Sequence, residues 1–216
     1  MIKVVLLEDE ELVRLSIKMI LESTGRIAVV ADRDDGVDAV DLVREFRPDL
    51  VVTDIRMPTV DGLEVTHRLR ALPSPPPVLL LTTFDLDEYV YEALGAGAAG
   101  FLLKDTPPRD LVRGVEMVTA GNAVLAPSAL RRMAVRYSGG AVARQAAAQA
   151  RLDSLTDRER EVVLAVATGA GNTEIAARLA VSEATVKVHV SRAMTKLGLD
   201  NRTQLAIVAF QAGAAG

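Results

Sequence analysis

Polar and charged side chains stand at the ends of four apolar runs in this sequence, where they could act together. Glu8 and Asp9 follow one run and Asp54 follows another, while Thr82 ends a third and Lys104 follows a fourth. If the runs are parallel strands, their carboxyl ends meet at one edge of a sheet, where such sheets carry their sites. The pattern predicts a site for a divalent cation and for phosphoryl chemistry.

The three acidic residues suit a hard cation. Mg²⁺ prefers oxygen ligands and retains several waters, so Asp9 and Asp54 supply two carboxylates and Glu8 reaches the ion through a water. Asp54 is then a competent nucleophile that forms an acyl phosphate. Thr82 can hydrogen-bond one phosphoryl oxygen, and Lys104 can pair with another as a point charge. The predicted mechanism is positioning plus charge neutralisation.

Short apolar runs in the sequence predict the strands that position these residues. The runs show little alternation of apolar and polar residues, which indicates strands buried on both faces. The runs cover residues 3–7, 27–31, 49–53, 78–82 and 99–103. Amphipathic segments of helix length lie at residues 10–23, 36–46, 61–71, 86–95 and 108–120. Five βα units favour an α/β fold, a doubly wound five-stranded parallel sheet with helices on both faces. Right-handed crossovers place the first and third strands side by side in one common strand order.

The chain from residue 153 onward predicts helices only. Thr156 and Glu159 form a capping box that begins the first helix, and Asn172 and Ser182 are expected to cap the second and third. Gly198 closes the third helix. The four predicted helices cover residues 157–168, 173–179, 183–197 and 203–211. The tight connection between the second and third predicts a small, all-α, four-helix domain with a helix-turn-helix.

The third of these helices has two distinct faces. Helical spacing points one face inward, with Val186, Val190, Ala193 and Leu197. The opposite face carries Thr185, Lys187, Val188, Ser191, Arg192 and Thr195. A valine beside cations suits a helix in the major groove of DNA, where it can meet a thymine methyl group while the cations reach base edges or phosphates. His189 either touches phosphate or packs inside.

Charge divides the 216-residue chain, whose net charge is −4. Residues 1–125 carry 13 basic and 22 acidic side chains, whereas the Ala- and Arg-rich segment 126–150 carries four arginines and no acid. Such asymmetry favours two domains with different partners. We expect a first domain over 1–122, a partly helical linker over 123–150 and the helical domain over 151–216.

Composition excludes several classes of protein. The sequence contains no cysteine, which excludes disulfides, thiol catalysis and zinc fingers built on thiolates. Its longest apolar runs are far shorter than the ~20 residues that span a bilayer, so no membrane partner is expected. Residues 1–7 lack the features of a signal peptide, and the cytoplasm is the expected location.

Residues 1–120 resemble the receiver domain of bacterial two-component response regulators, which has a flavodoxin-like fold. The matching residues are Glu8-Asp9, Asp54, the loop Met57-Pro58-x-x-Asp61-Gly62, Thr82 and Lys104. The resemblance implies that a sensor histidine kinase phosphorylates Asp54, and that Asp9, Asp54 and the backbone carbonyl of Arg56 bind Mg²⁺. It also implies that Phe101 is a switch aromatic, which moves inward as Thr82 swings toward the phosphoryl group. Glu8 stands where Asp is commoner in the family.

Residues 153–211 resemble the LuxR-type helix-turn-helix of NarL/FixJ regulators. The carrying motifs are Leu155-Thr156-x-Arg158-Glu159-x-Glu161, Asn172-x-Glu174-Ile175-Ala176, Thr185-Val186-Lys187-x-His189 and Lys196-Leu197. The resemblance implies that Lys187 and Val188 read bases and that the fourth helix is a dimer surface. Ser191 stands where other members often carry a basic residue.

Together these features predict a phosphorylation-regulated transcription regulator, not an enzyme, that binds promoter DNA as a homodimer. Three alternatives stay open: a regulator with a vestigial receiver, a metal-dependent phosphatase or phosphotransferase, and an interaction module that never meets DNA. Residues 95–100 fit G-x-G-x-x-G, but they follow a predicted helix and enter a strand. A dinucleotide fingerprint has the opposite order, so we expect no NAD or FAD.

Overall fold

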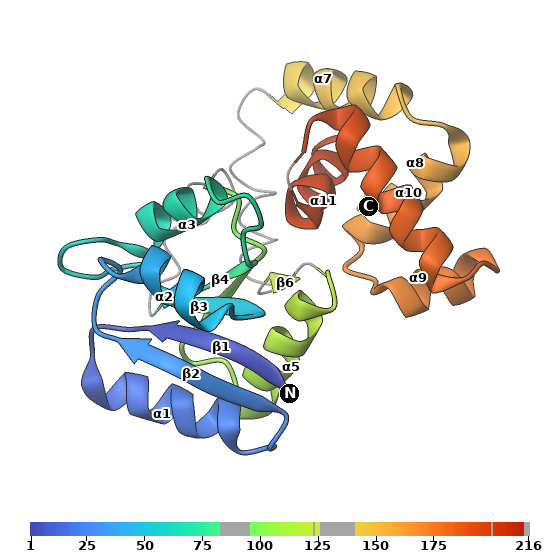
Figure 1. Ribbon diagram of the computed structural model, residues 1–216. Coiled ribbons are helices and arrows are strands. Elements are labelled where there is room, and N and C mark those ends of the chain that lie inside the picture. The colour runs from blue at the N-terminus through green and yellow to red at the C-terminus, as the bar shows by residue number, and fades with distance from the viewer. Residues whose placement is uncertain (83–95, 123, 126–140, 200, 214–216) are drawn as a thin grey trace. The chain divides into compact units, whose positions relative to one another are not determined.

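A computed structural model describes residues 1–82, 96–122, 124–125, 141–199 and 201–213 (Figure 1). The chain divides into two compact units, an N-terminal unit (Met1–Ala126) and a C-terminal unit (Pro127–Gly216). The predicted helix at 86–95 and most of the predicted linker, with Gly139 and Gly140, lie outside the described residues. In the part that is described, no helix has the length and apolar composition needed to cross a membrane.

The N-terminal unit is built on an all-parallel sheet with the strand order β2-β1-β3-β4-β5-β6. The strands are β1 (Ile2–Leu7), β2 (Ile27–Arg33), β3 (Leu50–Asp54), β4 (Val78–Thr82), β5 (Gly100–Leu103) and β6 (Val124–Leu125). The five predicted strands are confirmed, and β1 lies beside β3 as expected. The sequence did not predict β6, because two residues are too short to form a recognisable apolar run.

Helices cover both faces of this sheet (Figure 1). The described ones are α1 (Glu11–Glu22), α2 (Ala39–Phe46), α3 (Gly62–Arg70) and α5 (Pro108–Thr119). Helices α1 and α5 share one core with alternate residues of the central strands, such as Leu6, Val52 and Leu81. Helices α2 and α3 contact each other and lie on the opposite face. Strands β3 and β4 are buried at every residue, which explains their unbroken apolar sequence.

The C-terminal unit is entirely helical where it is described. Its helices are α7 (Ala141–Asp153), α8 (Asp157–Ala167), α9 (Asn172–Leu179), α10 (Glu183–Leu197) and α11 (Arg202–Gln211). Four helices were predicted after residue 153, and α7 adds a fifth to the same core. Ala148 and Leu152 of α7 are buried in the cluster that also contains Val163, Val186 and Leu205.

The helix ends follow the predicted caps with one exception. Thr156 and Glu159 form the expected capping box, and the Ser182 hydroxyl accepts a hydrogen bond from the Thr185 N–H at 3.1 Å. The prediction that Asn172 caps α9 is wrong. Gly171, whose backbone is extended, is the N-cap, and its N–H donates to the Glu174 carboxylate at 3.0 Å. Asn172 is the first helical residue, and its side chain accepts from Arg202 at 2.5 Å.

Candidate functional site

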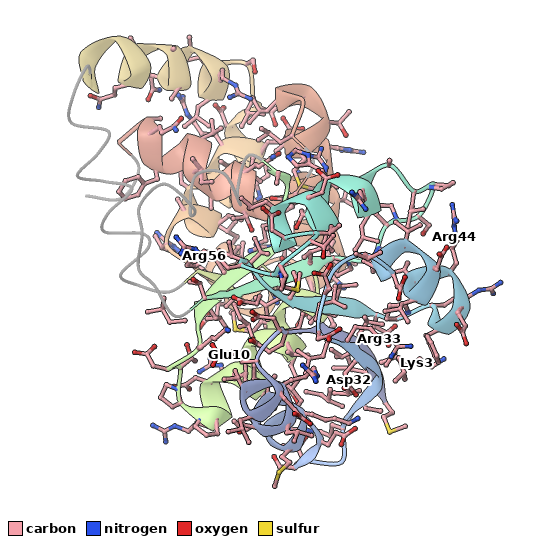
Figure 2. The ribbon with its side chains drawn as sticks, turned by 90° about the vertical axis from the view of Figure 1, so that its left-hand side faces the viewer. Lys3, Glu10, Asp32, Arg33, Arg44 and Arg56 are labelled. Carbon is pink, nitrogen blue, oxygen red and sulfur yellow. The ribbon has the colours of Figure 1, made fainter. Side chains whose placement is uncertain are left out.

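Three carboxylates converge at the carboxyl ends of β1 and β3. Glu8 and Asp9 follow β1, Asp54 is the last residue of β3, and each contributes an oxygen atom that lies within 4.8 Å of the others. We call these three residues the acidic pocket. Figure 2 looks onto the side of the molecule where β1 and β2 end, with Glu10, Asp32 and Arg56 labelled. The strand order brings the pocket together, since β1 and β3 are direct neighbours.

Lys104 provides the pocket with a cation. Its Nζ lies 2.8 Å from a carboxylate oxygen of Glu8 and 3.0 Å from Asp54 Oδ2. All three groups are buried, with side-chain exposures of 8% for Lys104, 0% for Glu8 and 8% for Asp54. One ammonium group therefore faces two buried carboxylates, while Asp9 is exposed at the rim. The described charges of the pocket sum to a negative value, which favours binding of a further cation.

Burial dominates the titration of this cluster. It raises the pKa of Glu8 and of Asp54 above the ordinary values, although the hydrogen bonds from Lys104 act in the opposite direction. Burial also lowers the pKa of Lys104, but its hydrogen bonds to Glu8 and Asp54 outweigh this effect and the pKa lies above its ordinary value. Lys104 therefore stays charged, but its single positive charge does not neutralise all the carboxylates of the acidic pocket.

The loop between β3 and α3 closes tightly around Asp54. The Ile55 N–H donates to Asp54 Oδ1 at 2.7 Å, and the Gly62 N–H donates to the Ile55 carbonyl at 2.9 Å. A Cβ on Gly62 would lie 2.2 Å from the Asp54 carbonyl oxygen, so only glycine allows this approach. Asp61 caps α3 by accepting from the Glu64 N–H at 2.8 Å. These contacts fix the backbone that carries Arg56, whose side chain is exposed.

The loop after β1 is held by side-chain contacts that the sequence did not predict. Arg14 Nη1 donates to the Glu8 carbonyl at 2.6 Å, and Asp32 holds the same guanidinium through its Nε at 3.5 Å. Lys18 also reaches Asp32, at 2.7 Å. The spacing of Arg14 and Lys18 on one face of α1 was visible in the sequence, but their partner comes from β2 and was not.

The other predicted residues of this site lie on β4 and β5. Thr82 is buried at the end of β4, and its carbonyl accepts from the Lys104 N–H at 2.8 Å, so the two residues end neighbouring strands. Phe101 is fully buried in β5. The resemblance to receiver domains implies that Phe101 moves inward on activation, and its ring is fully buried in this structure. The carboxyl edge of the sheet thus brings Glu8, Asp9, Asp54 and Lys104 together, and Thr82 ends the neighbouring strand β4.

The second candidate site is the outer face of α10. The predicted inward residues Val186, Val190, Ala193 and Leu197 are all buried. The side chains of Lys187, Val188, Ser191 and Arg192 are exposed, with 46% of Val188 accessible to solvent. Thr185 is half-buried and its hydroxyl lies 2.8 Å from that of Ser182, so capping of the helix already uses it. His189 is half-buried, and its Nδ1 has no hydrogen-bond partner among the described residues.

Polar contacts hold α10 against its scaffold. Lys196 Nζ donates to the buried carboxylate of Glu159 at 2.7 Å, and this bond together with the capping box lowers the pKa of Glu159 to about 2. Arg158 of α8 donates to the carbonyl of Leu179, the last residue of α9, at 2.7 Å. At the start of α11, burial lowers the pKa of Arg202 to about 10. Helix α10 is thus joined to α8 by the Lys196–Glu159 bond, and its buried face packs in the core of the C-terminal unit.

Comparison with known proteins identifies the families that the two parts of the chain match. Residues 4–116 match the family described as the response regulator receiver domain, and residues 153–209 match bacterial regulatory proteins of the luxR family. The response regulator protein VraR of Staphylococcus aureus (strain NCTC 8325 / PS 47) is 36% identical over 210 residues, which are 97% of each chain.

Two solved structures extend the comparison. The response regulator ChrA of a heme-sensing two-component system is 38% identical and aligns with a TM-score of 0.55, over 99% of this chain and 98% of its own. A LuxR-family DNA-binding response regulator from Staphylococcus aureus is 28% identical with a TM-score of 0.53, over 55% of this chain and 99% of its own. The receiver family match, the luxR family match and the full-length relatives show that the chain belongs to the two-component response regulators, which join a receiver domain to a LuxR-type DNA-binding domain.

Proposed function

We propose that Asp54 is the residue through which a sensor histidine kinase controls this regulator, and that α10 reads promoter DNA in response. The observation that carries the proposal is the contact of the buried Lys104 ammonium with both Glu8 and Asp54. This arrangement leaves a strand-end aspartate beside a fixed cation and within 4.8 Å of two further carboxylates. We further propose that residues 1–122 form the receiver, 123–150 a partly helical linker whose helical end packs on the following helices, and 151–216 the DNA-binding domain.

The donor set of the acidic pocket fits Mg²⁺, since it offers three hard carboxylate oxygens within 4.8 Å of one another, with Asp9 exposed. Glu8, Asp9, Asp54 and the backbone carbonyl of Arg56 would hold the ion, with Glu8 acting through a water. When bound, Mg²⁺ supplies charge neutralisation for the carboxylates and for the incoming phosphoryl group.

The chain's own residues then perform the transfer. A carboxylate oxygen of Asp54 attacks the phosphorus of a phosphohistidine, the new O–P bond replaces the P–N bond, and the released imidazole takes a proton from solvent. Lys104 is placed to exchange its contact with Asp54 for one with a phosphoryl oxygen. Thr82, at the end of the neighbouring strand, supplies a hydroxyl donor. The step labels the protein once and turns over no small substrate, so we propose no enzyme activity of its own.

The phosphoryl group adds a charge of about −1.5 to −2 at neutral pH. We propose that Thr82 and Phe101 form the switch that senses this charge. The resulting change controls a homodimer whose two α10 helices match a two-fold DNA site. The DNA contacts of each copy would come from Thr185, Lys187, Val188, Ser191 and Arg192, and the protein would act in the cytoplasm.

Acetyl phosphate labelling tests the phosphoacceptor. The wild-type chain with Mg²⁺ is expected to gain one acid-stable, base-labile phosphoryl group per chain, measured by intact-protein mass, and Asp54→Asn is expected to gain none. Asp61→Asn is a matched control, because Asp61 caps α3 and lies outside the pocket. A wild-type chain that stays unlabelled would favour a vestigial receiver, while continuous release of phosphate from many small phosphoesters would favour a phosphatase.

Salt-dependent binding tests the DNA-binding face. Lys187→Ala is expected to weaken binding to a promoter fragment and to lower the log–log salt slope by about 1, because one phosphate or base contact of the cation is lost. Arg109→Ala, which removes one cation from an exposed position of α5, is expected to leave the slope unchanged. Equal slopes for wild type and Lys187→Ala would refute the role of this helix.

A further inference from the structure

One carboxylate outside the acidic pocket accepts hydrogen bonds from three backbone N–H groups. Asp35, in the loop after β2, accepts from Thr59 through Oδ2 at 2.7 Å and from Val60 through Oδ1 at 3.1 Å. Oδ1 also accepts from the Val37 N–H at 3.1 Å. Two of these bonds join segments 24 and 25 residues apart in the sequence. The carboxylate therefore connects the loop after β2 to the loop after β3.

The residue after Asp35 strengthens the same connection. The Gly36 N–H donates to the Val60 carbonyl at 3.2 Å, so Val60 is held through both its N–H and its C=O. A Cβ on Gly36 would lie 2.5 Å from that carbonyl oxygen and 2.3 Å from a methyl group of Val65. The two loops thus touch so closely that no larger residue fits at Gly36.

The loop after β3 is the one that runs from Asp54 through Arg56 to α3. Its ends are held by the bonds of Ile55 to Asp54 and of Gly62 to Ile55. Asp35 binds the part between these ends, three and four residues beyond Arg56. Burial alone would raise the pKa of Asp35, but the three N–H donors outweigh it and the pKa lies below its ordinary value, so the group is a carboxylate at neutral pH.

We infer that Asp35 is a positioning residue for the phosphorylation site, which holds the loop so that the backbone carbonyl of Arg56 is preorganised for a divalent cation. The inference rests on the proposed function of Asp54. Groups that orient metal ligands without touching the metal typically change affinity tenfold to a hundredfold when they are altered. Asp35 holds the loop by accepting from backbone N–H groups with both of its carboxylate oxygens. Only the unprotonated carboxylate can accept all of these hydrogen bonds at once.

Titration of the full-length chain with Mg²⁺, followed by amide NMR shifts in the absence of any phosphoryl donor, tests the inference. Asp35→Asn retains the shape but presents an NH₂ group to at least one backbone N–H. We expect its Kd for Mg²⁺ to rise about tenfold and the amides of Thr59 and Val60 to exchange faster with solvent. Asp34→Asn removes the same charge from an exposed neighbour, and its Kd is expected to stay within about twofold of wild type because no ligand-orienting bond is lost.

The outcomes separate this inference from the proposed function. If the wild-type and Asp35→Asn chains bind Mg²⁺ with equal Kd, the role of Asp35 alone is overturned. The same holds if Asp34→Asn and Asp35→Asn lose equal Mg²⁺ affinity, since the loss would then come from the change in net charge. A wild-type chain without Mg²⁺-dependent shifts would overturn the proposed metal site and this inference with it. If Asp35→Asn does not give a folded spectrum, Asp35→Ser, which keeps one acceptor oxygen, takes its place with the same expected rise in Kd.

Discussion

Asp54 carries its charge in a crowded, buried place, and its neutralisation is expected to stabilise the N-terminal unit when divalent cations are absent. An oxygen of the buried Glu8 lies within 4.8 Å of Asp54, which gives a repulsion of about 3–4 kcal/mol at an effective dielectric constant of 20, and the exposed Asp9 adds a smaller repulsion that solvent screens. Lys104 at 3.0 Å attracts with about 5.5 kcal/mol on the same scale. The attraction of Lys104 and the two repulsions are of similar size, so burial, which raises the pKa of Asp54, decides the sign and favours the neutral form.

We therefore expect Asp54→Asn to raise the free energy of unfolding of this unit by about 1–2 kcal/mol in EDTA. The amide oxygen can still accept from the Ile55 N–H, so the loop should keep its shape. Mg²⁺ should narrow this difference in the free energy of unfolding between Asp54→Asn and wild type. At an Mg²⁺ concentration of ten times the Kd, binding raises the free energy of unfolding of the wild-type chain by about 1.4 kcal/mol. Hydrogen exchange of peptides from β1 and β3, in urea and with EDTA or Mg²⁺, measures this unit separately from the C-terminal one.

The pH dependence of the same difference gives a second test. Burial raises the folded-state pKa of Asp54 above the ordinary 3.8, so the folded state binds the proton more tightly than the unfolded state. The wild-type chain then gains stability as the pH falls through the folded-state pKa toward 3.8, and its deficit against Asp54→Asn should shrink in that window. Asp34→Asn, an exposed control, should change stability by less than about 0.5 kcal/mol. An Asp54→Asn chain that is less stable than wild type in EDTA would refute the electrostatic reasoning.

Two further predictions concern the C-terminal unit. Glu159→Gln keeps an acceptor for the capping box but loses the charge that faces Lys196, so we expect a loss of about 1 kcal/mol in urea unfolding near neutral pH, after discounting for the exposure of Lys196. The folded-state pKa of about 2 means that this contribution is complete above 4.5 and disappears as the pH falls toward 2; equal acid sensitivity of both chains would contradict it. Ala180 has a left-handed φ of 52° at the turn between α9 and α10. Ala180→Gly should therefore stabilise the unit by about 0.5–1 kcal/mol in thermal unfolding. A destabilised variant would show that the methyl group of Ala180 contributes more than the backbone strain costs.

Much of the fold was predictable because its signals are local. The unbroken apolar runs of β1, β3 and β4 can be recognised residue by residue, and the caps at Thr156, Ser182 and Gly198 follow from the chemistry of a few neighbouring groups. Asn172 was assigned wrongly, because cap preference ignores the buried Arg202 that claims its side chain from α11. The core residues of α7 were also not predicted, since an alanine-rich helix shows little amphipathic pattern.

Residue types and their order along the chain determined that carboxylates, a hydroxyl and an ammonium group would gather at one edge of a parallel sheet, since strand ends follow from short-range hydrophobic patterns and handed crossovers. Only the tertiary structure decided which groups support them. Arg14 is held by Asp32, and Asp35 accepts from Thr59 and Val60. Each of these contacts joins segments that are distant in sequence, and polar contacts of that kind depend on ångström-scale distances that no local pattern encodes.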